Sequence, residues 1–367
     1  MGTELRVVMA GGGTGGHLYP GIAVARELLA QRPDAIVTFA GTAMGIESRV
    51  VPREGFELDT IRSGGLKGKS RVERARGLML VPLGLLDAWD VVSRRRPHLV
   101  IGVGGYSSGP IVLTAALRHV PTMLLEQNAV PGLTNRLLSR VVRAAAVTYE
   151  STGAFFGAKA FVSGNPVRAE FVGARDAGTE VSEPVPASRA GILICGGSQG
   201  AHAINLAMVE AAPGLANLGV ALRVVHQTGE RDVDMVRAGY AAAGLRAEVE
   251  PFLYDMGVRF AQADLIVCRA GATTLAELTA SGKPSILIPL PTATDDHQRK
   301  NAEALASTGA AEMLLQADAT GAALGGRIAA LVKDVGVRMR MSAAARAQAR
   351  PDAARVIVER ALDLVKS

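Results

Sequence analysis

His17 is a side chain suited to proton transfer near neutral pH, and it comes directly after a glycine-rich turn. Residues 7–28 read as a strand, a turn with the spelling G-x-G-x-x-G, and a helix. Backbone amides at such a turn can bind an anion, and ligands of open α/β sheets bind at the carboxyl ends of the strands. The sequence therefore predicts that His17 lies in a ligand site.

The glycine turn alone does not make a dinucleotide site. Such a site also needs an acidic residue about 20 residues further on, at the end of the second strand, to hold the ribose hydroxyls. Here the predicted second strand ends at Gly41 and Thr42, and the nearest acids, Asp34 and Glu47, lie before and after it. An NAD(P)-dependent oxidoreductase is therefore disfavoured, although the turn can still bind another anion.

A second group of polar residues follows two strands in the other half of the chain. In the run 268–278, Thr273 and Thr274 lie at a predicted helix start, where hydroxyls and backbone amides suit a diphosphate. Glu277 lies about one turn further, where a carboxylate can accept hydrogen bonds from a ribose diol. Side chains that could bind sugar hydroxyls follow the strand ending in ILIPLP, namely Asp295, His297, Gln298 and Asn301. The alternatives are an ordinary capped helix and a solvated helix start.

The elements that must position these residues alternate between strand and helix. Continuous apolar strands separated by helices indicate parallel sheets covered on both faces. Examples of the predicted strands are 6–11, 35–41, 98–105, 122–127, 143–149, 160–164, 191–197, 222–229, 263–271 and 284–290. A chain of 367 residues, with a break in the alternation around 164–190, predicts two doubly wound α/β domains, 1–164 and 165–350. Residues 351–367 predict a helix that packs back on the first domain, with an apolar stripe at Val356, Leu362 and Val365.

The composition of the chain favours some classes of binding partner and disfavours others. A formal charge of +6 is compatible with nucleic acid, anionic lipid or a phosphorylated substrate, but 4% aromatic residues disfavour a single-strand nucleic-acid binder, and no nucleic-acid partner is expected. Cys195 and Cys268 each end an apolar run, which predicts two buried thiols, and no residues have the spacing of a metal site. No apolar run reaches the roughly 18–20 residues needed to span a bilayer, and no signal peptide is evident, so a cytoplasmic protein is expected.

One segment, 67–98, combines basic and apolar residues in a way that suits a membrane surface. Basic side chains precede the apolar run 78–86, namely Arg62, Lys67, Lys69, Arg71, Arg74 and Arg76. Candidate membrane contacts are Leu78, Leu80, Leu83, Leu86 and Trp89. At about 1 kcal/mol per basic residue, such a contact would be peripheral and salt-sensitive. A core helix of the same length is the alternative.

Seven motifs taken together resemble the MurG family of N-acetylglucosaminyltransferases of peptidoglycan synthesis. They occur in the family's order over residues 7–303 and are GGGTGGHLYPGIAVA, GVGGYSSGP, EQNAVPGLTN, GNPVR, GGSQGAHAIN, CRAGATTLAE and DDHQRKNA. The resemblance implies a GT-B fold, two Rossmann-like domains facing a cleft. It also implies transfer of N-acetylglucosamine from UDP-N-acetylglucosamine to the 4-hydroxyl of the muramoyl sugar of undecaprenyl-pyrophosphoryl-MurNAc-pentapeptide (lipid I), with inversion, forming lipid II.

The same resemblance implies partners and a location. No cofactor is expected, and the anionic surface on the cytoplasmic face of the cell membrane is the expected docking site of a peripheral protein. Other cell-wall synthesis proteins are expected partners.

The resemblance also implies roles for individual residues. Acceptor and transferred sugar lie near Thr14, Gly15, Gly16 and Asn128, and Tyr106 is a further substrate-binding residue. The donor diphosphate lies near Arg168, Ser198 and Gln199. Uridine is held by Leu253, Ala272, Thr273, Thr274, Leu275 and Glu277, and the donor sugar by Gln298. We hypothesise His17 as the general base, with Glu126 as the alternative; Leu125 stands where the family often has a histidine.

Two rival functions remain at this level. A UDP-N-acetylglucosamine epimerase of the same fold would use the donor without a lipid acceptor, and would have no need of the segment 67–98. A non-catalytic membrane-binding module would leave the donor motifs without a purpose.

Overall fold

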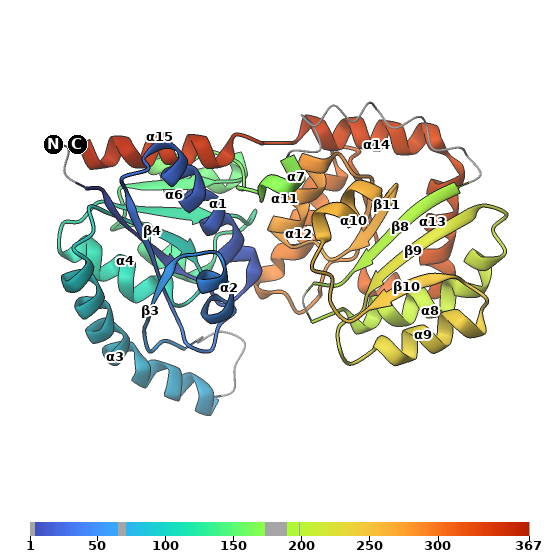
Figure 1. Ribbon diagram of the computed structural model, residues 1–367, viewed down its shortest axis with the longest axis horizontal. Coiled ribbons are helices and arrows are strands. Elements are labelled where there is room, and N and C mark those ends of the chain that lie inside the picture. The colour runs from blue at the N-terminus through green and yellow to red at the C-terminus, as the bar shows by residue number, and fades with distance from the viewer. Residues whose placement is uncertain (1–3, 65–70, 173–188, 198, 367) are drawn as a thin grey trace. The chain divides into compact units, whose positions relative to one another are not determined.

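The computed structural model describes residues 4–64, 71–172, 189–197 and 199–366, with the backbone alone for 71–80 and 294. The chain forms two compact units, one of residues 1–168 and 350–367 and one of residues 169–349 (Figure 1). The apolar strands separated by helices form two doubly wound parallel sheets, which confirms the predicted fold class.

The first unit is built on a parallel sheet with the strand order β3-β2-β1-β4-β5-β6-β7. Its strands are β1 (Arg6–Gly11), β2 (Ile36–Gly41), β3 (Glu57–Thr60), β4 (Leu99–Gly104), β5 (Thr122–Glu126), β6 (Ala144–Val147) and β7 (Ala160–Val162). Its helices are α1 (Gly15–Gln31), α2 (Glu47–Arg53), α3 (Arg71–Arg95), α4 (Ser108–Leu117), α5 (Leu133–Leu138), α6 (Glu150–Phe156), η1 (Gly157–Lys159) and α15 (Ala353–Lys366).

The central strands of this sheet, such as β1 and β4, are mostly apolar because both of its faces are covered. In β1, Val7 and Met9 enter the core beneath α1 and α15, whereas Val8 and Ala10 enter the core beneath α3 and α4. Alternate residues of one strand therefore face opposite cores, which removes the polar positions of a half-exposed strand.

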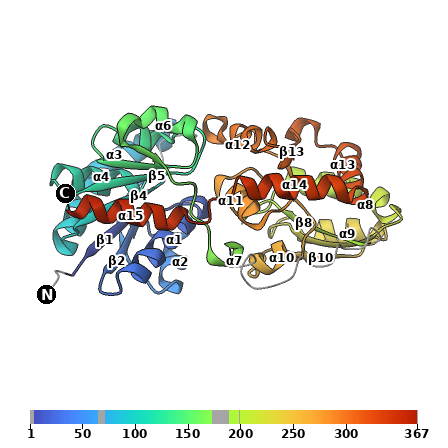
Figure 2. The same ribbon diagram turned by 90° about the horizontal axis from the view of Figure 1, so that it is seen from above.

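The C-terminal helix α15 belongs to the first unit and lies beside α1 (Figures 1 and 2). Its buried face is Ile357, Val358, Ala361 and Leu364, together with Ala353. The predicted apolar stripe therefore does not coincide with the buried face of the helix. Val356 is only half-buried, and Leu362 and Val365 lie at the margin of the core. Positions spaced by the 3.6-residue helical period, alanine included, define the face that packs.

The second unit repeats the plan with the strand order β10-β9-β8-β11-β12-β13. Its strands are β8 (Arg189–Cys195), β9 (Ala221–Gln227), β10 (Ala247–Glu250), β11 (Leu265–Cys268), β12 (Ser285–Leu287) and β13 (Ala311–Met313). Its helices are α7 (Ala169–Val172), α8 (His202–Ala216), α9 (Val233–Ala242), α10 (Met256–Gln262), α11 (Ala272–Ser281), η3 (Thr294–Asp296), α12 (His297–Ala306), η4 (Gln316–Asp318), α13 (Gly321–Lys333) and α14 (Val335–Ala347).

The two cysteines are buried free thiols at strand ends, as predicted. Cys195 and Cys268 end β8 and β11 and are register partners of the two neighbouring strands. Both pack into the same apolar core.

Candidate active site

Three neighbouring strands of the first sheet bring the two predicted catalytic residues, His17 and Glu126, and the predicted substrate-binding residue Tyr106 to one edge. β1, β4 and β5 are adjacent, and their carboxyl ends lead to His17, Tyr106 and Glu126. The strand order reverses between β1 and β4, which is where open α/β sheets bind ligands. Glycines make the close approach possible: a Cβ at Gly104 (φ +101°) would lie 2.6 Å from the His17 Nδ1 atom.

Gln127 orients the imidazole of His17. The Gln127 side chain is buried and donates from Nε2 to the Val103 carbonyl oxygen at 3.0 Å, which fixes which end of the amide is oxygen. Its Oε1 lies 3.2 Å from His17 Nδ1, so Nδ1 carries the proton and the lone pair of the neutral ring is on Nε2. Our sequence reasoning missed Gln127, although it stands within the EQN motif.

Glu126 shapes the loop that follows β5. Its carboxylate is 2% exposed and accepts hydrogen bonds at both oxygens. Oε1 accepts from the Asn128 amide at 3.0 Å, and Oε2 accepts from the Gly132 amide and from Asn135 Nδ2, both at 2.9 Å. The lone pairs of this carboxylate are therefore engaged by the segment 128–135, which comprises the loop after β5 and the start of α5.

The remaining predicted acceptor residues surround the glycine turn. Thr14 is exposed and precedes Gly15 and Gly16 at the start of α1. The Tyr106 ring is 40% exposed and lies beside Gly13, 3.7 Å from where a Cβ would stand. Arg168, which was predicted for the donor diphosphate and not for the acceptor, has its guanidinium 4.8 Å from the centre of the Tyr19 ring on α1.

In the second unit, the predicted donor residues follow β8, β10, β11 and β12. Gln199 is exposed after β8, and Ser198 lies outside the described residues. Gln227, buried at the end of β9, donates to the Gly197 carbonyl oxygen at 2.8 Å and accepts from the Leu253 amide at 3.3 Å. This side chain ties the loop after β8 to the segment after β10, and sequence reasoning missed it.

The run 268–278 forms the end of β11 and the first turns of α11. Thr273, Leu275 and Glu277 are buried, and Thr274 is half-buried. Arg269 donates to the Ile288 carbonyl oxygen at 3.0 Å and to Gln316 Oε1 at 2.7 Å, and burial lowers the pKa of its guanidinium. Arg269 therefore links the segments that follow β11, β12 and β13.

The residues after β12 divide into two roles. Gln298 Oε1 accepts from the Leu290 amide at 3.0 Å, which orients its NH2 group as a donor. Asn301 is fully buried and donates to the Ala270 carbonyl oxygen at 3.3 Å. The prediction that Asn301 contacts a sugar is therefore disfavoured, because its amide stabilises the turn after β11.

Helix α3 has one buried and one exposed face, which answers the question left open by its sequence. Ala88 and Val91 are in the core, whereas Leu83, Leu86 and Trp89 are 36%, 65% and 55% exposed. The side chains of Leu78 and Leu80 lie outside the described residues.

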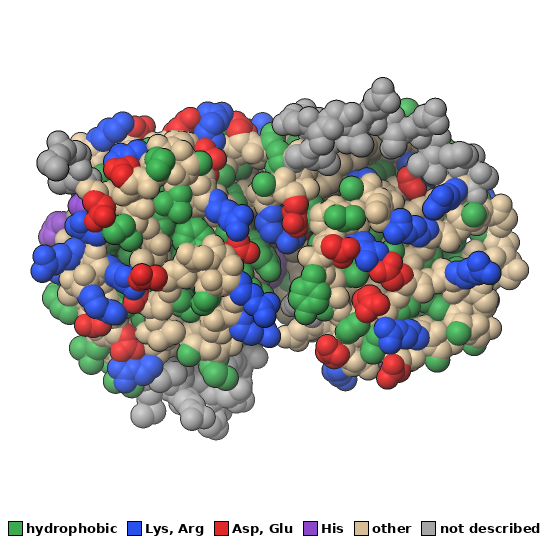
Figure 3. Space-filling view, viewed as in Figure 1, with side chains coloured by type: hydrophobic (Ala, Val, Ile, Leu, Met, Phe, Trp, Pro, Cys, Tyr) green, Lys and Arg blue, Asp and Glu red, His purple; other side chains and the backbone are tan. Residues whose placement is uncertain are grey.

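Neighbouring helix α4 extends the exposed face of α3. It adds Leu117, 67% exposed, and ends beside Arg118, whose guanidinium lies 4.8 Å from the Trp89 ring. Figure 3 shows apolar, basic and acidic side chains interspersed along the lower left edge of the first unit, where α3 lies. No helix in the described part of the chain is long and apolar enough to cross a membrane.

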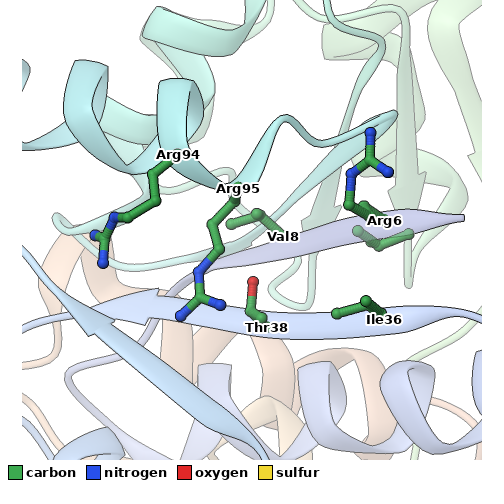
Figure 4. Close-up of a pocket in the computed structure, with 7 residues that line it drawn as sticks. Arg6, Val8, Ile36, Thr38, Arg94 and Arg95 are labelled. Carbon is green, nitrogen blue, oxygen red and sulfur yellow. The ribbon is translucent and has the colours of Figure 1, made fainter. Parts of the chain in front are cut away.

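A small pocket of about 180 Å³ lies between α3 and the sheet (Figure 4). It is lined by Arg6, Val7, Val8, Ile36, Thr38, Arg94 and Arg95. Arg95 forms ion pairs with two acids of β3, from its Nε to Asp59 Oδ2 at 2.7 Å and from its Nη1 to Glu57 Oε2 at 2.6 Å. These carboxylates neutralise much of the charge of the Arg95 guanidinium. The pocket is at the end of the strands away from His17, which does not favour a ligand site.

Both units match one family of known proteins. Residues 7–147 match the glycosyltransferase family 28 N-terminal domain, and residues 191–357 match the glycosyltransferase family 28 C-terminal domain. The chain is 46% identical, over 98% of its length and 99% of the relative, to the UDP-N-acetylglucosamine–N-acetylmuramyl-(pentapeptide) pyrophosphoryl-undecaprenol N-acetylglucosamine transferase of Pelobacter propionicus. Its relative of the same name from Anaeromyxobacter sp. (strain K) is 45% identical over 99% of this chain and 94% of the relative.

Solved structures give the same fold. The crystal structure of Acinetobacter baumannii MurG matches with a TM-score of 0.79 at 32% identity, over 98% of this chain and 99% of that one. A UDP-N-acetylglucosamine 2-epimerase matches with a TM-score of 0.72 at 16% identity, over 98% and 95%. At that identity the likeness to the epimerase shows the fold alone.

Proposed function

The chain belongs to glycosyltransferase family 28, and from this premise we propose that it transfers N-acetylglucosamine from UDP-N-acetylglucosamine to N-acetylmuramyl-(pentapeptide) pyrophosphoryl-undecaprenol. The reaction converts lipid I into lipid II in peptidoglycan synthesis, by attack of the 4-hydroxyl of the muramoyl sugar with inversion. The observation that carries the proposal is about 45% identity, over nearly the whole chain, to transferases of that name. The epimerases share only the fold, so that alternative is not favoured.

We propose His17 as the general base. The acceptor hydroxyl attacks the anomeric carbon of the donor sugar, the bond from that carbon to the UDP oxygen breaks, and the proton passes to Nε2. The orientation of the ring by Gln127 supports this assignment, because it leaves the basic lone pair on Nε2. Arg168 and the amides of the segment 197–199 would stabilise the charge that develops on the leaving diphosphate.

The donor site proposed in the second unit uses the segments tied by Gln227. The Leu253 segment and the start of α11 would hold uridine, with Glu277 on the ribose and the amide of Gln298 on the sugar. The orientation of the Gln298 NH2 group supports the last of these roles.

The reaction is tested with labelled UDP-N-acetylglucosamine and a short-chain lipid I analogue. A labelled disaccharide product should form only when the acceptor is present. Conversion of the donor into its 2-epimer without acceptor would instead support the epimerase.

We propose that Glu126 holds the segment 128–135, the loop after β5 and the start of α5, in place. Substitution of Glu126 distinguishes this structural role from that of a general base. In Glu126→Gln the amide NH2 must face at least one backbone or asparagine donor, which should lower the free energy of unfolding by about 2 kcal/mol. Transfer should fall by less than about tenfold, since the base is intact. Chemical denaturation and steady-state kinetics measure the two effects, with exposed Glu150→Gln as control. A loss of 10²-fold or more at unchanged stability would make Glu126 the base.

We also propose that the exposed face of α3 and α4 docks at an anionic membrane surface. In the double variant Leu86→Glu/Trp89→Glu, apolar burial is lost and two negative charges oppose the lipid, so binding to vesicles should fall at least about tenfold. Transfer to a soluble short-chain acceptor should not change. Sedimentation with vesicles containing anionic phospholipid measures binding, with Met339→Glu, exposed on α14, as the matched control. Equal vesicle binding by both variants would contradict the proposal.

A further inference from the structure

A buried carboxylate lies inside the glycine turn, and the proposed reaction does not use it. Glu47, the first residue of α2, is 0% exposed. Its Oε2 accepts from the Gly13 amide at 2.7 Å, and its Oε1 accepts from the amide and from the hydroxyl of Thr42, both at 2.8 Å. The carboxylate therefore joins the turn after β1 to the end of β2.

The backbone around Glu47 leaves room for this side chain alone. A Cβ at Gly12 would lie 2.6 Å from its carboxyl carbon, one at Gly41 would lie 2.7 Å from its Cγ, and one at Gly45 would overlap its Oε2. Three glycines, one in the turn after β1 and two between the end of β2 and the start of α2, thus line the space that the carboxylate fills. Such a fit indicates that the turn is built to hold an anion of its own.

The Glu47 carboxylate lies where folds of this type bind the pyrophosphate of a dinucleotide. Where a turn of this spelling binds a dinucleotide, its amides face the pyrophosphate, and an acid at the end of the second strand faces the ribose. In this chain Thr42 follows the second strand, and the amide of Gly13 is bound by Glu47 instead. The chain thus lacks the acid that would bind a ribose, and it has a carboxylate of its own where a pyrophosphate would bind.

We infer that Glu47 is a positioning and specificity residue: an internal anion that occupies the phosphate place of the glycine turn. It excludes a nucleotide from the first unit. It also holds residues 11–13 in the conformation from which Thr14, Gly15 and His17 meet the acceptor. This second part rests on the proposed function, whereas the occupation of the turn by an internal anion does not.

Glu47→Gln keeps the shape of the side chain and removes its negative charge, and it should affect the acceptor but not UDP. In Glu47→Gln the NH2 group of the new side chain must face either the Gly13 N–H or the Thr42 N–H. One of these two buried backbone donors then loses its acceptor. We expect kcat/KM for the acceptor to fall about tenfold. The dissociation constant of UDP should stay within about twofold, because the proposed uridine residues belong to the second unit.

Removal of the side chain tests the anion directly. In Glu47→Ala the space is empty, and formate or inorganic phosphate at about 100 mM should raise the unfolding temperature by several degrees and partly restore kcat/KM for the acceptor. Chloride at equal ionic strength should do neither. Wild type and Glu54→Gln, which removes a half-buried carboxylate just after α2, should not respond.

Two results would overturn the inference: wild-type kcat/KM for the acceptor in Glu47→Gln, or equal stabilisation of wild type and Glu47→Ala by formate and phosphate. If Glu47→Ala does not fold, Glu47→Gln decides through the split between acceptor kcat/KM and UDP binding. If wild type itself transfers no sugar, the proposed function fails, and the response of Glu47→Ala to anions still decides whether the turn holds an internal anion.

Discussion

Replacement of His17 by alanine should lower kcat for sugar transfer by about 10²–10⁴-fold, the usual effect of losing a general base. The reason is geometric, because Gln127 fixes the tautomer of the ring and so leaves a basic Nε2 at the switch point of the first sheet. UDP should bind with a dissociation constant within about twofold of wild type, since a base acts on the acceptor hydroxyl. Single-turnover kinetics with labelled donor and titration calorimetry with UDP measure the two quantities.

Two further variants make this expectation specific. Gln127→Leu keeps the imidazole but removes its orientation, and should lower kcat by about tenfold. His98→Ala removes a half-buried histidine that accepts from the Arg6 amide at 3.0 Å, in the same unit but at the other end of the sheet, and should leave kcat unchanged. Activity of His17→Ala close to that of wild type would reject His17 as the base.

The parts of the fold that were visible in the sequence are those with a continuous apolar signal. The central strands β1, β4, β8 and β11 are buried on both faces and stand out as apolar runs. The strands that were not named from the sequence, β3, β10 and β13, are all short edge strands: β3 and β10 end their sheets on one side, and β13 ends the second sheet on the other. In β10, for example, only Val249 is buried, so the segment 247–250 carries no run that a sequence pattern could reveal.

The candidate site was visible for a different reason. Parallel strands carry their ligand residues at the carboxyl ends, so polar residues after apolar runs could be selected without knowing the strand order. The residues that orient them could not. Gln127 acts on His17 across 110 positions of sequence, Gln227 joins segments 30 and 26 positions away, and Glu47 reaches the glycine turn from 34 positions on. These contacts depend on which strands are neighbours, and no local pattern encodes that.

A buried histidine beneath the proposed donor site makes the stability of the second unit depend on pH. His226 is fully buried in β9, its Nδ1 lies 2.7 Å from the Tyr240 hydroxyl, and its Nε2 lies 3.0 Å from Asn205 Oδ1. Asn205 donates from Nδ2 to the Thr228 carbonyl oxygen at 2.9 Å, so its Oδ1 accepts and His226 is the neutral Nε2–H tautomer. Burial lowers the pKa of His226 to about 3, although the charge of Asp232 acts in the opposite direction.

The sign of the effect follows from which state binds the proton. The unfolded chain protonates His226 near its ordinary pKa of 6.5, and the folded unit does so only near 3, so the stabilisation is complete above pH 6.5 and is lost as the pH falls toward 3. Between pH 7.5 and 4.5 this one group should lower the free energy of unfolding by about 2–3 kcal/mol. In His226→Gln, which cannot titrate, that part of the pH dependence should vanish. Urea denaturation of both proteins at the two pH values measures the difference, and parallel losses in wild type and variant would show that other groups carry the pH dependence.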